Sequence, residues 1–271
     1  MLVSHSLSSA ARRAQRHLFS VLAAAGSVGS RATILAQRKG QGRSEAEFGS
    51  ETSQRSRSLL FLAAASLVAS VLMVREVYIN ENGVLAVHVP MTPARLGSYS
   101  TRTASPALLE RFGQTATDAL GTQVEVHNKL LHLTKPDVAG EGIRLGHKKA
   151  LAETISCWSI GRTNRHCGWC VPCLIRRIAC EYHTIPDAVY ESHPFDGIPE
   201  SDTKAKDNLG HLIMLAQSFT TRSDEDLLLD YPEQVYVGQS IKPREVLDLY
   251  RRWGEQAISV LQSHTFSAGL L

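Results

Sequence analysis

The chain has 271 residues, which is enough for one large domain or two small ones. Its apolar fraction of 43% excludes a disordered or fibrous protein, and a formal net charge of +3 is too small by itself to indicate nucleic-acid binding. The five cysteines are too few for a disulfide framework, and their clustering indicates a metal in a reducing compartment, with the cytosol as the default location.

The N-terminal stretch has two interpretations. Before Glu45 there are seven Lys/Arg residues and no acidic residue, which is the composition of a mitochondrial transit peptide. The same stretch also reads as a strand, LVSH, followed by an amphipathic helix in which Leu18, Val21 and Leu22 face a core. We favour the strand and helix, because a cleaved leader does not begin with a hydrophobic strand.

The apolar stretch Ser58–Val74 follows a polar loop rich in Gly, Ser and charge. Its length is at the lower limit of roughly 17 residues for a membrane span. It is flanked by Arg57 and Arg75 and leads directly into a strand-like segment. We therefore predict a helix of an α/β domain that is buried on both sides, with a membrane span as the alternative.

The remainder alternates between strand-like and helix-like segments. Val77–Ile79 and Val84–Val89 read as short strands separated by a turn at Asn82-Gly83, and Thr122–Asn128 reads as another strand. A polar loop rich in hydroxyls and arginines precedes a helix that starts at Ser105 with Pro106 in its first position. Further helical patterns cover Val138–Leu151, Asp207–Phe219 and Pro243–Leu261, while Asp224–Leu229 has no clear pattern.

This alternation predicts an α/β domain with a parallel sheet over residues 1–150 and a largely helical, metal-binding region over residues 151–271. The polar loops lie between strands and helices, where open α/β sheets usually bind ligands.

The segment SCWSIGRTNRHCGWCVPCLIRR carries the pattern C-x9-C-x2-C-x2-C, with cysteines at Cys157, Cys167, Cys170 and Cys173. Four thiolates surround zinc tetrahedrally, and a site closed in this way is structural because no position stays open for a substrate. Gly168 permits the tight turn that such a site needs. An iron–sulfur cluster with Cys180 as a further ligand and a set of buried free thiols are the alternatives.

These residues carry a resemblance to a known family. Ser156-Cys157, then Cys167-Gly168 with Cys170 and Cys173, and the arginines at 176 and 177 reproduce the C-terminal signature of the 7-cyano-7-deazaguanine synthase family. QRSRSLLFLAAA, from Gln54 to Ala65, resembles a second family motif, in which Arg57 supplies the arginine before an apolar helix. The resemblance runs from about Leu2 to Arg177 and implies the Rossmann-like (HUP/PP-loop) fold of the PP-loop ATP pyrophosphatase superfamily.

Two features set this chain apart within that resemblance. The ENG at Glu81–Gly83 and the segment Pro90–Pro106 are more similar to divergent relatives encoded with antiphage defence systems. The SGGxDS loop, which cradles the pyrophosphate of ATP in the superfamily, is absent from the sequence. GSVGSRAT at Gly26–Thr33 is a weak substitute, and the expectation is an N-terminally truncated sheet that begins at the second strand of the fold.

The resemblance implies that a carboxylate on a 7-deazaguanine-type substrate is converted to a nitrile with ATP, Mg²⁺ and ammonia. Arginines and hydroxyls in the polar loops are suited to bind the phosphate and carboxylate groups, and Glu81 is suited to accept hydrogen bonds from a purine-like ring. Lys135, in LTKP, resembles a lysine of the family's substrate region. The loop candidates are Arg57, Arg95, Ser98, Ser100, Thr101 and Arg102. No catalytic residue is assigned.

A second hypothesis belongs to a different class. Without the phosphate loop, the chain reads as a catalytically inactive fragment or a zinc-containing interaction module. A protein partner or a missing N-terminal segment would complete the enzyme, whereas a membrane and direct nucleic-acid binding are not expected.

Overall fold

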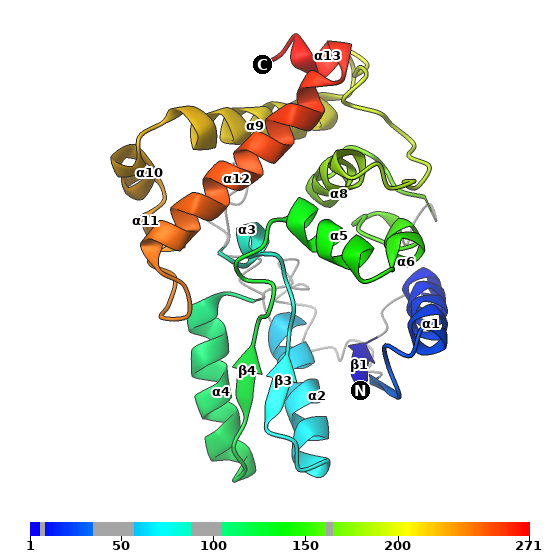
Figure 1. The fold of residues 1–271 in the computed structure, drawn as a ribbon, viewed down its shortest axis with the longest axis vertical. Coiled ribbons are helices and arrows are strands. Elements are labelled where there is room, and N and C mark those ends of the chain that lie inside the picture. The colour runs from blue at the N-terminus through cyan, green and yellow to red at the C-terminus, as the bar shows by residue number, and fades with distance from the viewer. Residues whose placement is uncertain (6–8, 35–56, 88–103, 161–164) are drawn as a thin grey trace, which may run out of the picture.

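The computed structural model describes residues 1–5, 9–34, 57–87, 104–160 and 165–271 (Figure 1). Its N-terminal part is a β-α-β unit formed by β1 (Leu2–His5), α1 (Ser9–Ala24) and β2 (Arg31–Ile34). The two strands are parallel, with Leu2 opposite Arg31, and α1 provides the crossover that a parallel pair requires. The predicted first strand and helix are confirmed, while GSVGSRAT runs into a strand and forms no loop before a helix.

A second parallel pair consists of β3 (Glu76–Tyr78) and β4 (Glu125–His127). The described residues thus form two small parallel sheets where the sequence predicted one continuous sheet. In the described residues between these strands, the chain forms the helices α3 (Gly83–Ala86) and α4 (Pro106–Leu120). The helix that starts after Ser105 is therefore confirmed.

The strand predicted from Val84 onwards is wrong over its described part, because Val84–Ala86 lie in α3. Asn82 caps this short helix by accepting a hydrogen bond from the backbone N–H of Leu85. The cap stabilises the first helical turn, and this local effect outweighs the strand preference of the valines.

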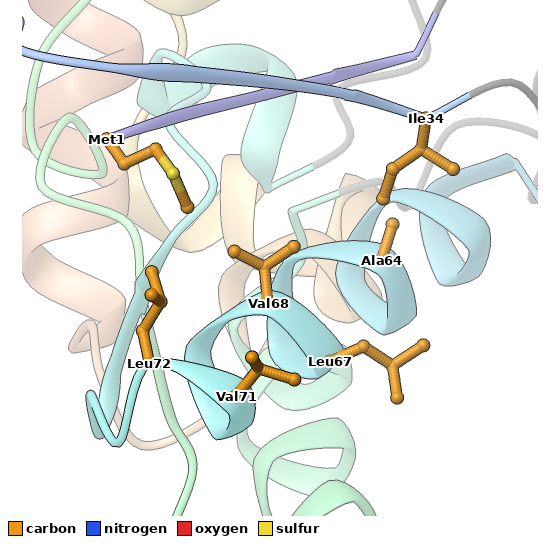
Figure 2. A pocket seen from close by; sticks show the side chains of 7 residues that line it. All are labelled: Met1, Ile34, Ala64, Leu67, Val68, Val71 and Leu72. Carbon is orange, nitrogen blue, oxygen red and sulfur yellow. The ribbon is translucent and has the colours of Figure 1, made fainter.

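Helix α2 (Arg57–Val71) packs against β1, β3 and α4. The prediction that both of its sides are buried is wrong, because Leu67 is 55% exposed and Val71 is 82% exposed. Figure 2 shows the apolar groove on this side, where Met1, just before β1, and Ile34 of β2 face α2. Within the described ranges, no helix has the length and apolar character needed to cross a membrane.

The C-terminal part is helical, as predicted. Its main core joins α9 and α12 through Phe219, Tyr250 and Trp253, which are fully buried, and the rings of Phe219 and Tyr250 stack with centroids 4.4 Å apart. Helix α9 lies at the opposite end of the molecule from β3, β4 and α4, and α12 runs from there towards the start of α4 (Figure 1). The helices after β4 are α5 (Lys135–Arg144), α6 (Lys148–Ala152), α8 (Val171–Tyr182), α9 (Thr203–Thr221), α10 (Asp224–Asp230), α11 (Pro232–Val235), α12 (Pro243–Gln262) and α13 (Thr265–Ala268).

Helix α12 connects the regions that carry the candidate sites. It packs against α8, which follows the cysteine segment, and against α3 and α5, which lie next to β3 and β4. The single helix predicted over Val138–Leu151 is two helices, α5 and α6, separated by a turn at Gly146 with a φ of 81°. The division of the chain at residues 150 and 151 stays a prediction.

Candidate functional site: a four-cysteine centre and a cavity at the end of a parallel strand

The four clustered cysteines meet in space. Their sulfur atoms all lie within 4.8 Å of one another, and all four side chains are buried. Cys157 comes from the loop after α6, Cys170 occupies the N-cap position of α8, and Cys173 lies in the first turn of that helix. The spacing of the cysteines in the sequence therefore predicted the group correctly.

Backbone geometry holds the sulfur atoms in place. The N–H groups of Ser159 and Cys167 point at the Cys157 sulfur at 3.3 and 3.4 Å, and the N–H of Cys170 points at the Cys167 sulfur at 3.4 Å. These donors favour thiolate sulfurs. Gly168 has a φ of 86°, and an added Cβ would lie 1.9 Å from the carbonyl oxygen of Ser192. Only glycine fits this turn.

The sulfur atoms of the group interact closely enough to shift the pKa values of three thiols in opposite directions. Hydrogen bonds from the thiols of Cys170 and Cys173 lower the pKa of Cys167 to about 2. Donation of their protons to Cys167 raises the pKa values of both Cys170 and Cys173. A divalent metal would replace these shared protons, because thiolates are the metal-binding form.

The donor set fits a soft metal ion. Four sulfur ligands suit zinc or an iron–sulfur cluster, and sulfurs about 2.3 Å from a zinc ion need little rearrangement from this spacing. All four positions around the ion would be filled by the chain, so the centre can stabilise the fold but offers no open position for a substrate.

Cys180 and His166 lie outside the four-sulfur group in the described part of the chain. Cys180 packs with Ala139, Ala179 and Ile185 in a separate apolar cluster. This position argues against Cys180 as a cluster ligand. His166 is buried and forms a backbone bridge with Tyr190.

The two arginines after the cysteines have partners other than the thiolates. Arg176 donates from Nε to Asp187 at 2.7 Å, and its Nη2 donates to the carbonyl oxygens of Leu151 and Ala152 at 3.2 and 3.0 Å. Arg177 pairs with Glu181 and Asp196. Both guanidinium groups therefore anchor α8 to its neighbours.

A second feature is a polar cavity of about 160 Å³ at the carboxyl end of β4. This is the edge at which parallel strands usually present ligand-binding residues. The cavity combines the end of a strand, the start of α4 and a loop from the C-terminal part. Its walls are formed by Ala104, Pro106, Leu109, Val126, His127, Asn128, Lys129, Leu131, His132 and Ser240.

Asparagine side chains fix the loops around this cavity. Asn128 accepts from the N–H of Glu81 at 3.2 Å and donates to the carbonyl oxygen of Glu81 at 2.8 Å. Asn80 accepts from the N–H of Lys129 at 3.1 Å. The segments that follow β3 and β4 are thus joined, and the polar residues between them have defined positions.

The cavity offers cationic and hydrogen-bonding groups. The Lys129 ammonium lies 5.3 Å from the centre of the Tyr78 ring, and His132 Nδ1 lies 3.7 Å from a carboxylate oxygen of Glu245. The Nε2 atom of His127 is buried and has no hydrogen-bond partner among the described residues. Such groups suit a small polar ligand with acceptor atoms or negative charge.

The predicted ligand-binding residues lie in different parts of the structure. Glu81 follows β3 as predicted, but one of its carboxylate oxygens accepts hydrogen bonds from the backbone and side chain of Asn82. Lys135 starts α5 and does not line the cavity. Arg57 is the first residue of α2. The candidates Arg95, Ser98, Ser100, Thr101 and Arg102 lie outside the described residues, and Ala104, just beyond that segment, is buried in the cavity wall.

Sequence reasoning missed His127, Lys129, His132 and Ser240. The first three end or follow a predicted strand, and the carboxyl end of a parallel strand was the signal that could have found them. Ser240 is more than a hundred residues away in the chain, and no local pattern connects it with the strand.

Comparison with known proteins identifies the segment that carries both features. Residues 54–183 match the family model described as queuosine biosynthesis protein QueC. This segment includes β3, β4 and all four clustered cysteines. Through it, the chain is similar to the 7-cyano-7-deazaguanine synthase family.

Individual members of the family show the extent of the similarity. The 7-cyano-7-deazaguanine synthase of Thiobacillus denitrificans is 32% identical over 124 residues, which cover 45% of this chain and 50% of that protein. The synthase of Myxococcus xanthus is 32% identical over 134 residues, covering 48% and 53%. The synthase of Paracoccus denitrificans is 38% identical over 93 residues, covering 33% and 38%. The chain spans about half the length of the curated relatives it matches, or less.

Proposed function

We propose that the chain acts as an ATP-dependent enzyme similar to 7-cyano-7-deazaguanine synthase, on a 7-deazaguanine-type carboxylate. The observation that carries this proposal is that one family-matched segment contains both the four-cysteine group and the strands that lead to the polar cavity. The cavity lies where α/β folds bind their ligands.

The reaction proposed is the formation of a nitrile from a carboxylate and ammonia. The carboxylate oxygen attacks the α-phosphate of ATP and releases pyrophosphate, and ammonia then displaces AMP from the acyl adenylate to give an amide. A second ATP activates the amide oxygen, and loss of AMP and protons leaves the nitrile. Both carboxylate oxygens thus leave on AMP, and water must be excluded from the acyl adenylate.

Within this reaction, the cavity residues are suited to bind and orient the substrate. Lys129 and the neighbouring histidines supply positive charge and hydrogen-bond donors for the carboxylate or a phosphate. ATP would bind with Mg²⁺, which supplies charge neutralisation at the phosphates when bound. We also propose that the phosphate or carboxylate groups are bound by Arg57, Arg95 and Arg102.

We assign zinc to the four-cysteine group, in a structural role and with one ion per chain. Four buried thiols at this spacing support zinc, and the position of Cys180 in a separate cluster disfavours an iron–sulfur cluster that uses it. The five cysteines are all free, which supports a reducing compartment such as the cytosol.

The biological setting proposed is queuosine-type nucleoside synthesis or phage defence. The segment ENG and the hydroxyl-rich loop after it are more similar to the relatives encoded with defence systems, which supports a role in phage defence. A protein partner or a further N-terminal segment that supplies a phosphate-binding loop is part of this proposal, with ammonia and a small molecule as the reacting partners.

A second candidate is a zinc-containing interaction module without catalysis. The sequence contains no SGGxDS motif, and this observation favours the second candidate. Both candidates include a metal in the four-cysteine group. Only turnover of a substrate therefore distinguishes them.

The experiment that separates them is incubation of the protein with 7-carboxy-7-deazaguanine, ATP, Mg²⁺ and ammonium. We expect AMP, pyrophosphate and the nitrile product, detected by mass spectrometry. Lys129→Ala should lower kcat/KM by about tenfold or more because it removes a charged contact from the cavity, whereas Lys204→Ala on the exposed surface of α9 should not. Absence of AMP and nitrile, with the metal retained, would favour the interaction module.

A further inference from the structure

One wall of the cavity comes from the far end of the chain. Ser240 lies in the loop between α11 and α12, outside the segment 54–183 that matches the family. It lines the same cavity as His127, Asn128 and Lys129, which follow or end β4. The C-terminal part therefore contributes directly to a space formed mainly by the family-matched segment.

Hydrogen bonds to α4 fix this loop. The carboxylate oxygen Oε1 of Glu110 accepts from the N–H groups of Gln239 and Ser240, both at 3.0 Å, and from the Ser240 hydroxyl at 2.6 Å. The N–H of Ala107, in the first turn of α4, donates to the carbonyl oxygen of Val237 at 2.9 Å. Four bonds thus join the loop to the helix that starts at the cavity.

Close packing adds to this restraint. Gly238 has a φ of 147°, and an added Cβ would lie 2.9 Å from both the backbone nitrogen of Ala107 and the Cβ of Pro106. Val237 and Ile241 on either side are buried in the main core. The loop is therefore held from both ends, and position 240 cannot move away from the cavity without breaking several contacts.

We propose that Ser240 and its loop determine how large a ligand can enter this cavity and which hydrogen bonds that ligand can make. The inference rests on the proposed function, in which the cavity binds a planar 7-deazaguanine-type base. The Ser240 hydroxyl donates its proton to Glu110, so its oxygen would act as an acceptor towards a ligand in the cavity. The ring and amino N–H groups of such a base are suitable donors. Selection of the ligand thus depends on the C-terminal part of the chain.

The first test uses thiol labelling. All five native cysteines are buried, whereas Ser240 is exposed at the cavity mouth, so Ser240→Cys introduces an accessible thiol. Ser201→Cys, at an exposed position before α9, is the matched control, and the unsubstituted protein gives the background. The probe is 7-carboxy-7-deazaguanine, alone and together with α,β-methylene-ATP and Mg²⁺. We expect the probe to slow labelling of Ser240→Cys severalfold and to leave Ser201→Cys unchanged.

The second test is calorimetric binding of the same probe. Ser240→Leu should weaken binding by about tenfold or more, because the isopropyl group that replaces the hydroxyl occupies the cavity while the backbone bonds to Glu110 remain. The melting temperature should stay close to that of the unsubstituted protein, since residue 240 is exposed. If the unsubstituted protein binds the probe but labelling and affinity do not respond at position 240, the role of the loop is refuted. If the unsubstituted protein binds no probe, the proposed function fails, and this inference fails with it.

Discussion

Asp137 joins two helices through a single carboxylate. It completes a capping box with Thr134 at the start of α5, accepts from Arg252 Nε at 2.8 Å and accepts from Gln256 Nε2 at 2.7 Å, both on α12. Burial by itself would raise the pKa of Asp137. The hydrogen bonds from Thr134 and Gln256 and the charge of Arg252 outweigh burial, so its pKa is lowered.

Asp137→Asn should lower the free energy of unfolding by about 1–2 kcal/mol at pH 7, because it removes the charge-assisted bond to Arg252 and weakens the cap. A carboxyl with a lowered folded-state pKa stabilises the fold above its unfolded-state pKa, which is about 3.9. This contribution is lost as the pH falls through the folded-state pKa. The difference between the variant and the unsubstituted protein should therefore shrink below about pH 4.

Urea unfolding at several pH values measures this difference. Asp118→Asn, on the exposed side of α4, is the control and should leave stability nearly unchanged at each pH. If the difference in unfolding free energy between Asp137→Asn and the unsubstituted protein stayed constant down to acidic pH, the charge of Asp137 would not contribute to stability.

At the scale of elements, α8 depends on the cysteine group at its start. Cys170 occupies the N-cap position of this helix and Cys173 lies in its first turn, so binding of a metal by the group would be coupled to formation of that turn. The rest of the helix is buried on several sides, including Ile175 and Ile178 in the main core. Loss of the metal should therefore disturb the contact between α8 and the helices around it.

Cys170→Ser should reduce bound zinc to well below one ion per chain and destabilise the fold by several kcal/mol. Elemental analysis of protein purified without added metal, together with thermal unfolding, measures both effects. Cys180→Ala is the matched control, since it removes another buried thiol on α8 but should retain the metal. Full metal content in Cys170→Ser, or iron with a brown chromophore in the unsubstituted protein, would contradict the zinc assignment.

At the scale of the whole molecule, the largest core extends from the family-matched segment into α9 and α12, and its aromatic centre lies outside that segment. Phe219, Tyr250 and Trp253 form its aromatic centre, with the Phe219 and Trp253 rings 5.9 Å apart. Because α12 also contacts α3, α5 and α8, this core supports the segments around both candidate sites.

Trp253→Ala should lower the free energy of unfolding by about 3–5 kcal/mol, because it leaves a large cavity in a fully buried position. Tyr236→Ala, at a residue that is 68% exposed, should change stability by only about 0.5 kcal/mol. The midpoint of urea unfolding measures both. Similar midpoints for the two variants would show that the aromatic centre does not dominate stability.

Some of this architecture could be predicted from short-range patterns. The spacing of the cysteines located the four-sulfur group, and Pro106 located the start of α4, because both signals lie within a few residues. Helix α2 was placed correctly, but its exposed side was not predicted. Its residues are apolar all round, so the sequence contains no pattern that distinguishes the covered side from the open one. Ser240 reaches the cavity only through tertiary packing, which no local pattern reports.

Arg176 has a consequence for how the protein opens. Arg176 lies on α8, the helix that also carries Cys173. It donates hydrogen bonds to the end of α6 and to Asp187, so α6, α8 and the segment around Asp187 share one buried guanidinium group. Separating any one of them would leave a buried charge with unpaired donors, which costs several kcal/mol. Local unfolding of the cysteine segment alone is therefore suppressed. We expect α6, the four-cysteine group and the start of α8 to open and close as one cooperative unit.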